Sequence, residues 1–286
     1  MKNLKYYLER AQKEGWAIGQ FNFSDFNQIK AIVSVADKMK SPVILGTSEG
    51  ESKFFGLTEA IVLRDSLRKE TGLPIFLNLD HGKSFEYLKQ AIDAGYDMVH
   101  FDGSKLPLEE NIKITKQVKK YAGRQVLVEG ELGIIATDAS KIYHEQVEIR
   151  EENLTVPKEA KEYAKKTGVD LLAVSIGNLH GMPDLGQEPR LRLDRLQEIK
   201  KEVGNLPMVL HGGSGTDQAD VKKAIELGIV KININTELRL AFAKGLREAL
   251  KNSEEIVPYK FLPQAQEAVE KVVGEKIKLF DSLNKI

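Results

Sequence analysis

The chain has 286 residues, of which 42% are hydrophobic and 29% are charged, as is usual for a globular protein with a large core. Its 42 basic residues balance 42 acidic ones, so the formal net charge of zero gives no sign of a nucleic-acid-binding surface. The absence of cysteine excludes disulfides, thiol catalysis and thiolate metal sites, so a metal would need His, Asp or Glu ligands.

The amino-terminal residues lack the apolar core of a signal peptide, and no segment is apolar over the length of a membrane span. We therefore expect a soluble, cytoplasmic protein that contacts neither a membrane nor a nucleic acid. Because the sequence has no internal linker or repeat, we also expect a single domain over residues 1–286.

After a short amphipathic helix at 3–14, the sequence alternates between two patterns. Apolar, strand-like runs lie at 17–23, 42–47, 75–79, 98–101, 126–130, 171–176, 208–210 and 231–234. Segments with helical periodicity lie at 27–40, 58–70, 85–94, 108–121, 158–166, 193–203, 218–227 and 238–250, with one or two more helices at 262–284. Helix-capping residues occur at sensible positions, namely Ser84, Gly95, Gly168, Gly204 and Gly228.

This alternation predicts a parallel sheet, because parallel neighbours need a crossover connection. Eight such units close naturally into an α/β fold of the (β/α)8 TIM-barrel type, here with additional N-terminal and C-terminal helices. The alternative, an open doubly wound sheet, usually has fewer strands and a glycine-rich turn after the first strand, and none follows Asn22. The polar segment 134–153 has no clear periodicity, and a loop of that length is more often functional than idle.

Polar side chains follow the predicted strands, where the carboxyl ends of a barrel share one mouth. These positions are Asn22, Ser48, Asp80 with His81, Asp102, Glu131, His180, His211 and Asn233. Singly, Ser48 and Asp102 are best explained as helix caps. Histidine and glutamate cap helices poorly, so the whole set indicates a site at the barrel mouth.

Three of the five histidines lie in His-Gly pairs after apolar runs, at His81, His180 and His211. Three neutral imidazoles are a common zinc-binding set that leaves a position open for water or substrate. Asp80, beside His81, is better placed to donate or accept a proton than to bind the same ion. Asp102 and Glu131 are suited to hold a second cation or to orient the histidines.

The other two histidines are not expected to bind metal. His100 lies within a strand, as a packed core residue would, and His144 lies in the 134–153 segment. Two late segments, 211–215 and 231–236, instead suggest a phosphate site. Each precedes a helix, and barrels often bind phosphate after strands seven and eight.

With these residues in place, the chain resembles the class II, metal-dependent fructose-bisphosphate and tagatose-bisphosphate aldolases. The resemblance covers nearly the whole chain and is carried in order by the motifs at 19–23, 41–45, 79–86, 101–104, 128–133, 178–181, 210–215 and 231–236. It implies a lyase of glycolysis and carbohydrate metabolism that reversibly cleaves a ketose 1,6-bisphosphate, fructose 1,6-bisphosphate first, to dihydroxyacetone phosphate and glyceraldehyde 3-phosphate.

The resemblance also implies residue roles. His81, His180 and His211 would bind the catalytic Zn²⁺, and Asp80 would move the proton of the C4 oxygen. Asp102 and Glu131 match a second site for a divalent or monovalent cation. The sugar phosphate would be bound by Asn22, Ser48, Gly181, Gly212, Gly213, Ser214, Asn233, Ile234, Asn235 and Thr236. Relatives are commonly dimers or tetramers, so a homodimer or homotetramer is expected.

Two departures from the family pattern leave alternatives open. The loop acid that moves the C3 proton in relatives has no clear counterpart here, with Asp138 and Glu145 as candidates. Segment 257–266 lacks the arginine that binds the distal phosphate in many relatives, although it contains Lys260. A tagatose-bisphosphate aldolase, a metal-dependent barrel hydrolase and a non-catalytic sugar-phosphate-binding relative therefore remain as alternatives.

Overall fold

The computed structural model describes residues 2–137, 141–145, 147–183, 190–251 and 254–286. Eight parallel strands close a barrel in the order β1-β10-β9-β7-β5-β4-β3-β2. The strands are β1 (Ile18–Asn22), β2 (Val43–Ser48), β3 (Ile75–Gly82), β4 (Met98–Phe101), β5 (Leu127–Leu132), β7 (Leu171–Val174), β9 (Met208–Leu210) and β10 (Ile229–Ile234). All eight predicted strands are present, so the barrel prediction is confirmed.

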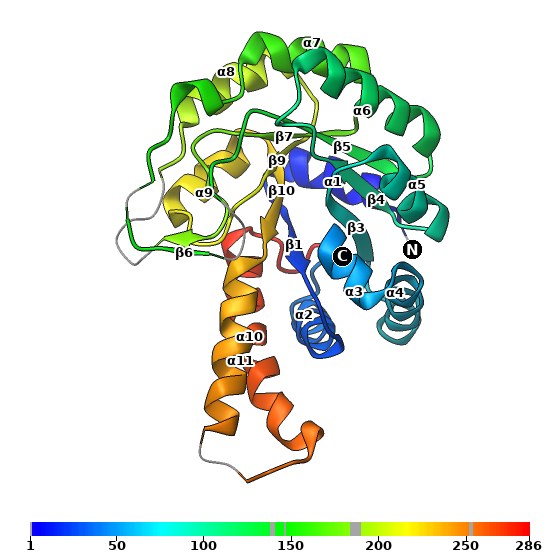
Figure 1. The fold of residues 1–286 in the computed structure, drawn as a ribbon, viewed down its shortest axis with the longest axis vertical. Helices are drawn as coiled ribbons and strands as arrows, with labels where there is room; N and C mark the ends of the chain where they lie inside the picture. Colours follow the sequence, from blue (N-terminus) through cyan, green and yellow to red (C-terminus); the bar gives the residue numbers. More distant parts are fainter. Residues whose placement is uncertain (1, 138–140, 146, 184–189, 252–253) are drawn as a thin grey trace.

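Helices surround the barrel (Figure 1). They are α1 (Leu4–Glu14), α2 (Phe26–Met39), α3 (Glu49–Phe55), α4 (Leu57–Thr71), α5 (Phe85–Ala94), α6 (Leu108–Ala122), α7 (Pro157–Thr167), α8 (Leu193–Val203), α9 (Gln218–Glu226), α10 (Thr236–Leu250) and α11 (Pro258–Leu279). Only α3 was not predicted. Ser84 caps α5 as expected, whereas α9 ends one residue before the predicted Gly228, at Leu227. No helix in the described ranges combines the length and apolar character needed to cross a membrane.

The 134–153 segment contains regular structure that the sequence pattern did not indicate. Its strand β6 (Ile142–Tyr143) pairs in parallel with β8 (Met182–Pro183), and a 3-10 turn spans Glu151–Asn153. Ala136 forms a bridge with Leu179 and accepts a hydrogen bond from the backbone N–H of His180 at 3.2 Å. This segment therefore packs against the loop that carries His180.

The barrel interior changes character from one end to the other. At the amino end it is apolar, because residues such as Ile18 and Phe76 join α1 in one buried cluster. Two positions further along β3, Asn78 donates to Gln20 across the barrel at 2.8 Å. The next inward position is Asp80, at the mouth. Alternate residues of a strand share one face, so this gradient places the ionisable groups at the carboxyl ends.

Helices α10 and α11 pack side by side and extend as an arm away from the barrel (Figure 1). Their closest approach is at Gly245, where an added Cβ would lie 2.9 Å from the Ala265 Cα and 3.0 Å from the Gln264 carbonyl oxygen. Both atoms belong to the backbone of α11, so neither can move aside without separating the helices.

We expect Gly245→Ala to destabilise the protein by about 1–3 kcal/mol, because overpacking at a backbone contact outweighs the roughly 1 kcal/mol gain in helix propensity. Gly274→Ala, in α11, is the matched control, since its Cβ would make only ordinary contacts, 3.6 Å from Val35 and 3.9 Å from Met39. The control should unfold at equal or higher urea concentration. Equal urea midpoints for the two variants would contradict the proposed close packing.

Candidate active site

Strand β3 delivers two consecutive side chains, Asp80 and His81, to the barrel mouth. Successive residues of a regular strand face opposite sides. Here His81 adopts a φ of +50°, and the register with β4 shifts between Leu79 and Gly82. A positive φ is uncommon for a residue other than glycine and is tolerated where the surroundings hold it, often at functional sites. This local irregularity lets the acid and the imidazole face the same site.

The three histidines of the His-Gly pairs converge from three different strand ends. The ring centroid of His81 lies 4.6 Å from that of His211 and 4.9 Å from that of His180, and the latter two are 6.2 Å apart. His211 follows β9 directly, and Gly212 after it has a φ of +65°. A Cβ on Gly212 would lie 1.9 Å from the Leu179 carbonyl oxygen, so only glycine allows the two His loops to approach this closely.

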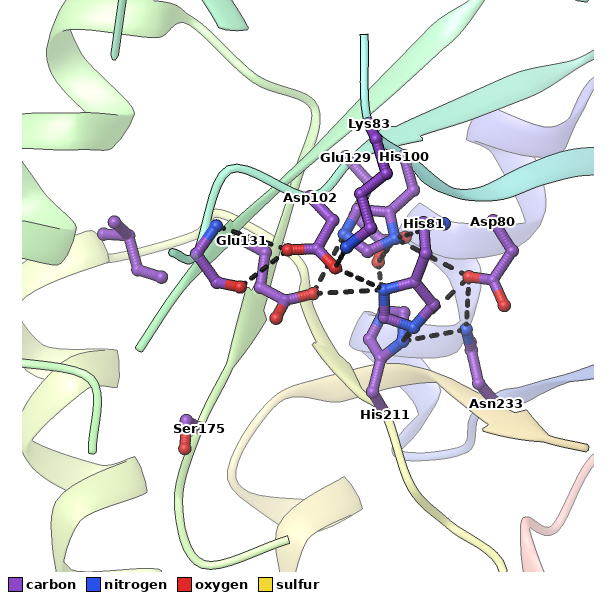
Figure 2. A network of polar contacts seen from close by, with 12 residues as sticks. Asp80, His81, Lys83, His100, Asp102, Glu129, Glu131, Ser175, His211 and Asn233 are labelled. Atoms are coloured by element: carbon purple, nitrogen blue, oxygen red, sulfur yellow. Dashed lines mark hydrogen bonds and ion pairs between the residues drawn. The ribbon is translucent and has the colours of Figure 1, made fainter. Parts of the chain in front are cut away.

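Carboxylates occupy the outer nitrogen of two of these rings (Figure 2). His81 Nδ1 is 2.9 Å from Asp102 Oδ2, and His211 Nε2 is 2.6 Å from Glu129 Oε1. When each of these nitrogens donates its proton to the carboxylate, His81 Nε2 and His211 Nδ1 carry lone pairs. These two nitrogens face each other at 3.1 Å. Two lone pairs at that distance repel unless a proton or cation lies between them, so the donor set fits a metal ion.

The protonation of two of the rings also suits a metal ligand. Burial, reinforced by the neighbouring His81 and His211 rings, lowers the pKa of His180 well below its ordinary value. Burial likewise lowers the pKa of His211, although the hydrogen bond to Glu129 opposes it. Both rings are therefore neutral at pH 7, which is the form that binds a cation.

Asp80 is held by two amides at the centre of the site. Asn233 donates to its Oδ1 at 3.0 Å, and Asn22 donates to its Oδ2 at 3.1 Å. Burial opposes ionisation of this carboxyl, but the adjacent His81 and His100 outweigh it and hold the pKa of Asp80 well below its usual range. Asp80 is thus a fixed, ionised carboxylate beside the histidine cluster, able to accept a proton.

Asp102 and Glu131 lie together on the other side of His81. Glu131 Oε2 is 3.8 Å from His81 Nδ1, and Asp102 also pairs with Lys83 (Figure 2). Ligand atoms of His81, Asp102 and Glu131 lie within 4.8 Å of one another, which is close enough to bind a single ion. Ser48, expected as a cap, does cap α3, because its hydroxyl accepts from the Glu51 N–H at 3.3 Å.

His100 is fully buried in β4, as predicted, but its surroundings are not those of an ordinary core residue. Its Nε2 lies 3.1 Å from Glu131 Oε2 without the alignment of a hydrogen bond, and its Nδ1 accepts from the His81 N–H at 3.1 Å. Burial would lower the pKa of His100, but the charges of Glu129, Asp80 and Glu131 raise it to about 10. His100 therefore belongs to the polar network beneath the site.

A pocket joins the histidines to the two late segments. Its lining residues are Asp80, His81, His180, Gly181, His211, Gly212, Ser214, Asn233, Asn235 and Thr236. Thr236 begins α10, so the pocket opens onto a helix amino terminus, where backbone N–H groups favour an anion. The backbone N–H of Gly213 instead bonds to the Asn233 carbonyl at 3.1 Å, and the Ile234 side chain packs in the core, so the latter could contact a ligand only through its backbone.

Several residues around the site were not singled out by their sequence pattern. Glu129 and Lys231 are fully buried inside the barrel, and Glu51 links Asn22 to Arg239 of α10. The first two sit within apolar runs, where inward and outward positions cannot be told apart without the register. Glu51 had a signal, since Ser48 and Glu51 have the spacing of a capping box.

The loop and distal candidates fare differently. Asp138 lies outside the described residues, and Glu145 is exposed. Lys260 is in the first turn of α11, where it pairs with Glu255 at 2.9 Å. Because α10 has 15 residues and spans about 22 Å, the start of α11 lies at the far end of the arm from the barrel (Figure 1). Within one chain, Lys260 is therefore remote from the pocket.

Comparison with known proteins gives a consistent result. The family described as fructose-bisphosphate aldolase class-II matches residues 2–285. The chain is 39% identical to the fructose-bisphosphate aldolase of Staphylococcus epidermidis and 39% identical to that of Geobacillus stearothermophilus, in each case over 99% of this chain and 98% of the relative. Its structure is similar to the crystal structure of the YdjI aldolase from Escherichia coli K12, with a TM-score of 0.84, 30% identity and coverage of 100% and 99%.

Proposed function

The chain belongs to the class II fructose-bisphosphate aldolase family, and on that premise we propose that it reversibly cleaves fructose 1,6-bisphosphate to dihydroxyacetone phosphate and glyceraldehyde 3-phosphate. One observation carries the assignment to this site, namely the convergence of His81, His180 and His211 beside an ionised Asp80. The family match removes the support for a barrel hydrolase.

The three histidines would hold Zn²⁺. His81 through Nε2 and His211 through Nδ1 are the nitrogens left free by their carboxylate partners. Zinc, when bound, polarises the ketone carbonyl and stabilises the negative charge that develops on its oxygen. Asp102 and Glu131 orient His81 and provide the site for a second cation.

Asp80 acts on the C4 hydroxyl group. In cleavage its carboxylate removes the O4 proton, the C3–C4 bond breaks, and the electron pair of that bond moves to C3 as the aldehyde forms. In condensation the protonated Asp80 returns the proton to O4. Asn22 and Asn233 each donate to one carboxylate oxygen, which fixes the group for transfer in both directions.

The glycine-rich turn after β9 and the start of α10 would bind the phosphate of the dihydroxyacetone half. This part of the site comprises Gly181, Gly212, Gly213, Ser214, Asn233, Ile234, Asn235 and Thr236, with Asn22 and Ser48 toward the aldehyde half. We further propose that the chain acts in the cytoplasm, as one domain over residues 1–286 and as a homodimer or homotetramer.

A coupled assay of aldol cleavage tests the proposal. Purified protein should cleave fructose 1,6-bisphosphate faster than tagatose 1,6-bisphosphate, as measured by reduction of the released dihydroxyacetone phosphate with NADH. Faster cleavage of the tagatose isomer would reassign the substrate. Tight binding of both sugars without cleavage would instead indicate a non-catalytic relative.

A further inference from the structure

The barrel interior contains a fully buried cation, Lys231 on β10, which the reaction described above does not use. Burying an ammonium group is costly unless it is paired and hydrogen-bonded. Its Nζ donates to Glu129 Oε2 at 2.8 Å and to Asn233 Oδ1 at 2.8 Å. Glu129, on β5, is equally buried. Because β5 and β10 are not neighbours, this ion pair crosses the barrel beneath the site.

One arm of the network ends on a zinc ligand. The second oxygen of Glu129, Oε1, accepts from His211 Nε2 at 2.6 Å. With Lys231 fixing Oε2, the carboxylate cannot turn away, so the proton of His211 stays on Nε2. Its Nδ1 then carries the lone pair that faces His81. A carboxylate that fixes the tautomer and angle of a ligating imidazole also raises its affinity for metal.

The other arm ends on the proton-transfer group. Lys231 bonds to the oxygen of the Asn233 amide, so the amide nitrogen must point the opposite way, toward Asp80 Oδ1 at 3.0 Å. Rotating the amide by half a turn would set its N–H groups against the ammonium. The orientation of Asn233, and through it the position of Asp80, is therefore also set by Lys231.

We propose that Lys231 and Glu129 are positioning residues, a single buried ion pair that aligns His211 for zinc and, through Asn233, Asp80 for proton transfer. The inference rests on the proposed function, since it concerns how the same site is held. An ion pair present only for stability would be an unusual choice, because buried pairs can often be replaced by apolar residues without loss. Linking two separate parts of the site explains why the charges are present.

The test compares variants that remove both charges together, so that no lone buried charge is left. Zinc is removed from each protein by dialysis, and its affinity is measured by competition with a chromophoric chelator. We expect Glu129→Gln/Lys231→Met to bind zinc about 10–100-fold more weakly than wild type. At saturating zinc its kcat should still be about tenfold or more lower, because Asn233 is released, with a smaller change in KM.

The single variant Glu129→Gln separates the two arms. It should lose zinc affinity but retain more of the kcat, because Lys231 still holds Asn233. Tyr96→Phe is the matched control, since it removes a buried hydrogen bond to Thr47, at 2.9 Å, outside this network. The control should keep wild-type zinc affinity and turnover.

Equal zinc affinity and turnover in the double variant and wild type would overturn the inference and leave the proposed function standing. A wild-type protein that neither binds zinc nor cleaves the sugar would overturn both. If the double variant does not fold, nitrogen NMR of ¹⁵N-histidine-labelled, zinc-loaded wild type decides. His211 should then show metal at Nδ1 and a proton at Nε2, and metal at Nε2 would disprove the arrangement.

Discussion

Removing the metal with EDTA should abolish aldol cleavage by the purified protein, and added zinc should restore it. The expected loss is about 10³-fold or more, since Lewis-acid stabilisation of the developing charge contributes several kcal/mol and each 1.36 kcal/mol is tenfold in rate. The described site offers His81, His180 and His211 for the ion. The measurement is the coupled cleavage rate before chelation, after it and after zinc is returned.

A pair of histidine variants separates a specific metal effect from a general one. His180→Gln should need much more zinc to reach half-maximal activity, because it removes one of the three ligands. His144→Gln, at an exposed histidine of the 134–153 segment, should behave as wild type. Full activity in EDTA, together with a covalent adduct trapped by borohydride and substrate, would mean that the protein uses a lysine Schiff base instead.

The barrel itself could be predicted because its signal is long and repeated. Eight apolar runs separated by helical segments admit few other topologies, and the predicted strand at 98–101 agrees with β4 to the residue. Helix α3 was missed because it has only seven residues and follows β2 without a turn. Strands β6 and β8 are two residues long and pair across distant segments, so no local pattern marks them.

The site was predictable at the strand ends and not below them. Asp80, His81 and His211 are found by the rule that a barrel gathers its chemistry at the carboxyl ends. Glu129 and Lys231 lie two residues deeper, where only the barrel register shows that they face each other. The positive φ of His81 is also invisible in the sequence, although it brings this ring to the same side as Asp80.

Replacing Asp80 should have the second large effect, and on one half of the reaction only. We expect Asp80→Ala to lower kcat for cleavage by about 10²–10⁴-fold while zinc content stays at the wild-type level, because Asp80 is assigned to the O4 proton and not to the metal. Cleavage and condensation should fall together, since both pass through transfer of this proton. Bound zinc is measured by elemental analysis and turnover by the coupled assay.

Proton exchange provides the internal control for this variant. Dihydroxyacetone phosphate alone has no O4, so loss of its C3 proton to solvent does not require a group at that oxygen. Exchange in deuterated water, followed by proton NMR, should therefore survive Asp80→Ala far better than cleavage does. Equal losses in both would place Asp80 in the C3 step as well, and normal cleavage would remove it from the mechanism. Asp80→Asn adds a test of charge, because its amide N–H₂ would oppose the donors on Asn22 or Asn233 and should not restore activity.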